Sequence, residues 1–114
     1  MNFDFDKFSQ ITASVYPPSG YSLQDALQVF KYYFEQYEKH TGKIHPPIKA
    51  SQIVRICQDM PYLTIGNYYP DVSPEDYKIM IDKHFETKYR VCDYNINHFF
   101  SGRIRELRYY EECY

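Results

Sequence analysis

Arginine and aromatic side chains alternate in the last third of the chain, and this combination is suited to binding nucleic acid. Guanidinium groups bind phosphates, and aromatic rings stack on bases. Residues 83–108 carry six basic and three acidic residues, a net charge of +3, although the whole chain carries −2. The six basic residues are Lys83, Lys88, Arg90, Arg103, Arg105 and Arg108. We therefore predict that they form the nucleic-acid-binding surface of a small accessory or regulatory module.

An intramolecular interpretation of the same cluster stays open. Three acidic residues lie close by along the chain, and each can neutralise an arginine: Glu106, Glu111 and Glu112. If this segment is helical, Arg105 and Arg108 share one face of the helix, whereas Arg103 lies on another. The basic residues would then belong to a solvated helix face that binds no nucleic acid.

The number of aromatic rings is also unusual. The chain has 14 Tyr and 8 Phe, against 19 residues of Leu, Ile and Val together, and no Trp. A buried tyrosine hydroxyl needs a hydrogen-bond partner, and fourteen tyrosines exceed the needs of a small core. Some should therefore be exposed, where tyrosine is a favoured contact residue of protein interfaces. A codon bias of AT-rich genomes would explain the same composition without any binding role.

The alternative hypothesis is thus a protein-binding adaptor or inhibitor that modulates a host protein complex through a tyrosine-rich surface. Its contact residues would be Tyr68, Tyr69, Tyr109 and Tyr110. Association of the chain with itself, as a homodimer, would use the same rings.

Residue types that perform catalysis are present, but their spacing is unsuitable. The potential zinc ligands near the C-terminus are His84, Cys92, His98 and Cys113. They lack the close pairs that hold zinc. Cys57 falls on an apolar helix face, where a thiolate is disfavoured. His40 and His45 flank a turn, and we expect both to face solvent.

Phosphate chemistry is also poorly supported. The four glycines are dispersed, so the chain has no glycine-rich phosphate-binding loop. Pro70-Asp71 followed by Asp76-Tyr77-Lys78 has the letters of a metal-dependent nuclease, but the spacing is too short and Asp76 belongs to a helix start. We predict a non-catalytic protein that needs no metal and no cofactor.

Three helices have clear signals. The segment Ser22–Lys39 begins at a capping serine, followed by Asp25, and has apolar residues at three- and four-residue steps. The segment from about Lys49 to Met60 is followed by Pro61, which ends a helix. The segment Ser73–Lys88 opens with Ser-Pro-Glu-Asp, which supplies a cap, a first-turn proline and two acids.

The remaining segments carry weaker patterns. From Tyr94 onward we predict two short helices with a bend at Gly102, with a strand over 104–110 as the alternative. A short strand is expected over 62–65. Residues 1–21 show few helix signals and are predicted to form an N-terminal arm, followed by a helical domain over 22–114. The arm would be attached by Phe3, Phe5 and Phe8.

The expected fold is mostly α: a compact single-domain bundle of four to five helices, with room for one short β-element. A winged-helix variant stays open because the helices over 49–60 and 73–88 could form its pair. About twelve residues separate them, however, where the simple motif has a turn of three to four. The acids that open the second helix would also repel phosphates.

The location is expected to be cytoplasmic, without membrane association. Three cysteines are an odd number and show no disulfide framework. The first seven residues are acidic and lack the apolar stretch of a secretory signal. No run approaches the roughly 18 apolar residues of a membrane helix.

Two segments resemble parts of small uncharacterised proteins of Firmicutes genomes and of their phages or mobile elements. They are Asp93-Tyr94-Asn95-Ile96-Asn97-His98-Phe99-Phe100-Ser101-Gly102-Arg103-Ile104-Arg105 and His45-Pro46-Pro47-Ile48-Lys49. The resemblance implies a bacterial cytoplasmic accessory protein of a phage or mobile element, and it brings no active site.

Overall fold

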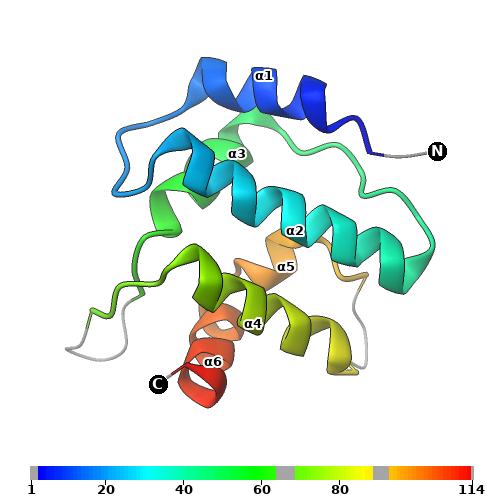
Figure 1. The fold of residues 1–114 in the computed structure, drawn as a ribbon, viewed down its shortest axis with the longest axis vertical. Helices are drawn as coiled ribbons and strands as arrows, with labels where there is room; N and C mark the ends of the chain where they lie inside the picture. The colour runs from blue at the N-terminus through cyan, green and yellow to red at the C-terminus, as the bar shows by residue number, and fades with distance from the viewer. Residues whose placement is uncertain (1–2, 64–68, 89–92, 114) are drawn as a thin grey trace.

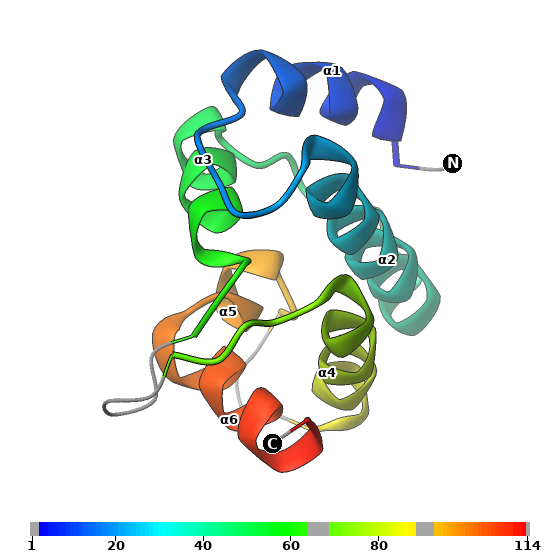
Figure 2. The same ribbon diagram turned by 60° about the vertical axis from the view of Figure 1, so that its left-hand side comes forward.

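Six helices make up the described part of the chain, which covers residues 3–63, 69–88 and 93–113 of the computed structural model. They are α1 (Phe5–Val15), α2 (Leu23–Thr41), α3 (Ala50–Asp59), α4 (Pro74–Glu86), α5 (Ile96–Phe99) and α6 (Gly102–Glu112). Helix α1 lies over α2 and α3, while α4 lies between α2 and α6 (Figures 1 and 2). The prediction of a mostly helical single-domain bundle is confirmed.

The helix starts that the sequence signals most clearly are confirmed. The Ser22 Oγ accepts a hydrogen bond from the Asp25 N–H at 3.1 Å. The Ser73 and Asp76 side chains each accept a bond from the other's N–H, at 3.1 and 3.0 Å, which closes a capping box. Gly42 ends α2 at a φ of +70°, in the left-handed region that favours glycine.

The N-terminal arm requires a correction, because residues 5–15 form α1. Asp4 caps this helix, and its Oδ1 accepts a bond from the Lys7 N–H at 3.1 Å. The ring of Phe8 is buried 4.9 Å from Phe30 and 5.0 Å from Phe34. These contacts with α2 lie far away in sequence, so the local pattern did not reveal them.

The predicted attachment of this segment through its phenylalanines is confirmed. The Phe3 ring stacks on Phe34 at a centroid distance of 4.2 Å, and both Phe3 and Phe5 pack against the core.

The C-terminal segment follows the first of its two predicted forms. Helices α5 and α6 are separated at Phe100–Ser101, so the bend next to Gly102 is confirmed and the strand over 104–110 is wrong. The strand over 62–65 is reduced, in the described residues, to one isolated bridge between Tyr62 and Asp71. Residues 64 and 65 lie outside the described residues. A wing would need a paired ribbon, which the described residues do not contain.

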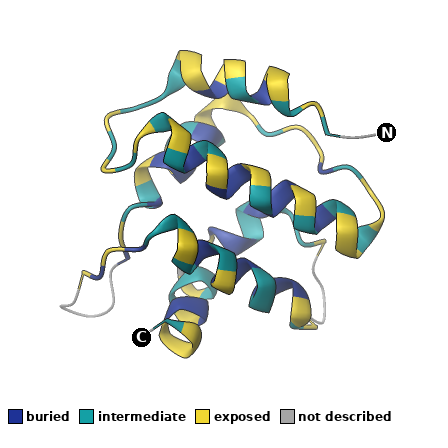
Figure 3. Cartoon of the chain, viewed as in Figure 1, coloured by how far each residue is buried: buried dark blue, intermediate teal, exposed yellow. Residues whose placement is uncertain are grey.

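The core is built from aromatic rings whose hydroxyls bind backbone carbonyls. Tyr33 and Tyr77 are fully buried. The Tyr33 hydroxyl donates to the Tyr94 carbonyl at 2.6 Å, and the Tyr77 hydroxyl donates to the Met60 carbonyl at 2.8 Å. Buried residues line the inner faces of the helices and exposed residues the outer faces (Figure 3). Among the described helices, none has the length and apolar character needed to cross a membrane.

Candidate functional site

Arg105 points into the body of the molecule and holds α6 in place. Its Nη1 donates to the Asp59 carbonyl, at the end of α3, and to the Tyr77 hydroxyl of α4 at 3.1 Å. Its guanidinium also lies over the Phe100 ring, 5.6 Å from the ring centroid. These contacts join α6 to α3 and α4. Because the guanidinium already binds groups of its own chain, it is poorly placed to bind a phosphate.

Arg108 is also used within the chain. The residue is only 5 % exposed, and its Nη1 lies 3.2 Å from a Glu111 carboxylate oxygen and 3.3 Å from the Thr87 Oγ1. Two of the six predicted nucleic-acid contacts, Arg105 and Arg108, therefore stabilise the fold. The intramolecular interpretation, with Glu111 as the partner, describes Arg108 correctly.

Of the other four basic residues in the predicted nucleic-acid surface, the structure describes three. Arg103 and Lys88 are exposed, and Lys83 is half-buried in the last turn of α4, where a cation is favourable to the helix dipole. Arg90 lies outside the described residues.

The tyrosines divide in a similar way. Tyr69 and Tyr110 are exposed, as a contact role requires. Tyr109 is only 8 % exposed and so lacks the exposure that a contact role requires: the period of α6 turns this ring inward while Tyr110 faces out. Tyr68 lies outside the described residues.

The outer face of α6 carries Arg103, a predicted nucleic-acid contact, and Tyr110, a predicted protein contact, together with Leu107. Arg103, Leu107 and Tyr110 follow each other at steps of four and three residues, which places them on one helix face. Leu107 is 45 % exposed and Tyr110 is 59 % exposed. With Glu106 they line an open hollow of about 350 Å³. We call these four residues the α6 surface. The sequence analysis did not include Leu107 among its candidate contact residues.

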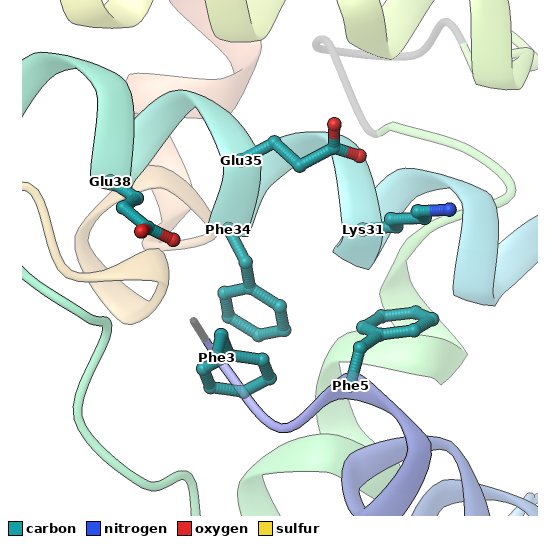
Figure 4. Close-up of a pocket in the computed structure, with 6 residues that line it drawn as sticks. All are labelled: Phe3, Phe5, Lys31, Phe34, Glu35 and Glu38. Carbon is teal, nitrogen blue, oxygen red and sulfur yellow. The ribbon is translucent and has the colours of Figure 1, made fainter. Parts of the chain in front are cut away.

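Two apolar hollows share the ring of Phe3. One, of about 290 Å³, is lined by Phe3, Phe5 and Phe34, with charged residues of α2 at its edge (Figure 4). The other, of about 310 Å³, lies between α1 and the connection that contains Ile44 and Pro47. Their walls are mainly hydrocarbon, and their lining offers no activated nucleophile among the described residues.

The described thiols are not activated. Burial raises the pKa of Cys57 to about 12 and, with nearby carboxylates, that of Cys113 to about 11. A reactive cysteine needs the opposite change, because only the thiolate attacks. No group of three or more His, Cys, Asp or Glu in the described ranges is placed to hold a metal ion. Cys92 lies outside those ranges.

His45 departs from the expectation that it faces solvent. It is buried against α2, 4.7 Å from the Tyr37 ring and 5.0 Å from the Phe34 ring. His40 is exposed as expected and stacks on Phe85 at 5.3 Å.

Known proteins add no further assignment. The chain matches no family model, no curated protein and no solved structure.

Proposed function

We propose that the protein is a non-catalytic module that binds another protein through the α6 surface. The observation that carries the proposal is the exposure of Leu107 and Tyr110 on the face of α6 that points away from Arg105 and Arg108. An apolar side chain and a tyrosine at the centre of a helix face, with charges beside them, is a typical composition for a protein interface. The partner surface would offer an apolar groove for Leu107 and Tyr110 and a carboxylate for Arg103.

The charge of this surface favours a protein over a nucleic acid. Arg103 is accompanied by Glu106 in the same hollow, so the described lining has one cation and one carboxylate. Binding to a phosphate backbone gains its affinity from several cations that displace counterions. Since Arg105 and Arg108 already have partners within the chain, they do not add to Arg103.

Leu107→Glu is expected to abolish capture of the partner from a lysate of cells that carry the protein, because it places a carboxylate in the apolar centre of the contact. Ile79→Glu on α4 is the matched control, since Ile79 is 48 % exposed and Leu107 is 45 % exposed. Affinity capture with quantitative mass spectrometry should show a protein that the wild type and Ile79→Glu retain and Leu107→Glu loses. Equal capture by all three chains would contradict the proposal.

The nucleic-acid alternative predicts a different set of effects, which a second experiment with two charge variants measures. Arg103→Glu and Lys88→Glu would then both weaken binding to DNA or RNA, and affinity would fall steeply with salt. The α6 proposal expects Arg103→Glu to weaken capture of a protein and Lys88→Glu to leave it unchanged.

A further inference from the structure

His45 connects the segment between α2 and α3 to the first turn of α5. Its Nε2 accepts a hydrogen bond from the Ile96 N–H at 2.9 Å, and its Nδ1 lies 2.8 Å from the Pro46 carbonyl. The first bond requires a bare Nε2, so the proton is on Nδ1 and the ring is neutral. A second proton, on Nε2, would place two donors face to face and break the bond to Ile96.

His84 contacts the same C-terminal segment from α4. The ring is fully buried, and its centroid lies 5.2 Å from Phe99, 5.4 Å from His98 and 5.6 Å from Tyr94. A positive charge on His84 would be buried among these rings and would face Arg108 of α6. Burial first, and then His98 and Arg108, lower the pKa of His84 to about 3.

We propose that His45 and His84 form an acid-sensitive latch, which holds residues 93–113 on the body made by α2, α3 and α4. His45 contacts the 93–113 segment through an Nε2 that must stay bare, and His84 of α4 contacts it as a fully buried ring. When the segment moves away, the two rings reach water and can take up protons. Mild acid therefore favours the open form, whatever partner α6 has.

Burial of the two rings sets this direction, and at His45 it outweighs the groups that act the other way. Burial lowers the pKa of His45, against the opposing effects of the Pro46 carbonyl and the Asp93 carboxylate. Asp93 belongs to the segment that moves, and it is exposed. For both rings the closed form is therefore favoured most above pH 6.5, the ordinary histidine pKa, and it loses this advantage as the pH falls. Carboxylates ordinarily titrate near pH 4, so the histidines dominate between pH 6.5 and 5.

Amide hydrogen exchange of the full chain, followed by NMR at pH 7, 6 and 5 and corrected for the intrinsic exchange rate, tests the latch. The protection of the Ile96 amide should fall below pH 6.5 by about tenfold per pH unit for each histidine that gains a proton on opening. The Phe30 amide of α2 should lose much less protection. Equal losses at Ile96 and Phe30 would show whole-chain unfolding and overturn the proposal, as would constant protection at both.

Two variants test whether the pH dependence of Ile96 protection comes from the His45 ring. His45→Gln keeps one donor and one acceptor but cannot titrate, so Ile96 protection should fall less steeply with decreasing pH than in the wild type. His40→Gln is the control, because His40 is exposed, and it should behave as the wild type. An unchanged pH response in His45→Gln would overturn the role of His45. If His45→Gln does not fold, the protonation of the His45 ring nitrogens is followed by NMR in the wild type. A doubly protonated His45 at pH 5 with the Ile96 amide still protected would equally overturn the role of His45.

Discussion

Phe99→Ala is expected to lower the free energy of unfolding by about 3–5 kcal/mol, the range for deleting a large aromatic side chain from a core. Phe99 is fully buried, and its ring contacts Tyr33 of α2, Tyr77 and His84 of α4, and Phe100. Neighbours from three elements cannot all move inward to fill the space. Small domains have a total stability of about 5–15 kcal/mol, so the variant should unfold at much lower urea concentration.

Leu107→Ala is the control for this measurement. Leu107 is a large apolar residue of the same C-terminal segment, but it is exposed, so its truncation should change the unfolding free energy by no more than about 0.5 kcal/mol. Urea titrations of the wild type, Phe99→Ala and Leu107→Ala measure the unfolding free energies. The dependence of the unfolding free energy on urea concentration should be similar in all three. A loss below about 1 kcal/mol for Phe99→Ala would contradict the description of the core.

Arg105→Ala is expected to cost about 2–3 kcal/mol of unfolding free energy, because hydrogen bonds to a charged group contribute about 1.5–3 kcal/mol. The substitution leaves the Asp59 carbonyl without the guanidinium that it accepts from, and it removes the cation from the Phe100 ring. The contact between α6 and the end of α3 should loosen first.

Arg103→Ala is the matched control, since it is the same residue type on the same helix but exposed. Its unfolding free energy should stay within about 0.5 kcal/mol of the wild type. Thermal unfolding of both variants checks the assignment of one arginine to the fold and the other to the surface. If both variants had equally small effects, Arg105 would not stabilise the fold and would be available to bind a ligand.

Local signals explain which parts of the fold are predictable from the sequence. The starts of α2 and α4 depend on hydrogen bonds between residues three apart, Ser22 with Asp25 and Ser73 with Asp76, so the residue types alone indicate them. Helix α1 also has a local cap, between Asp4 and Lys7, but the sequence analysis did not single it out. Its stability depends on Phe8 packing against α2, more than twenty residues away, and a short segment with two buried positions resembles an arm.

The candidate site was less predictable, for a related reason. The sequence does place Arg105 and Arg108 on one face of a helix and Arg103 on another. It does not indicate which face turns inward, because that depends on acceptors distant in sequence: the Asp59 carbonyl and the Tyr77 hydroxyl. The same ambiguity applies to Tyr109 and Tyr110, which are adjacent but have opposite environments.

The most direct test of the account is photo-crosslinking in cells that carry the protein, with p-benzoylphenylalanine in place of Tyr110 or, as the control, of Ile79. Both side chains are exposed, so both positions tolerate the larger ring. The account predicts a protein adduct from position 110 that survives nuclease treatment and is absent from position 79. Equal adducts from both positions, or an adduct that nuclease removes, would contradict the α6 surface as a protein-binding site.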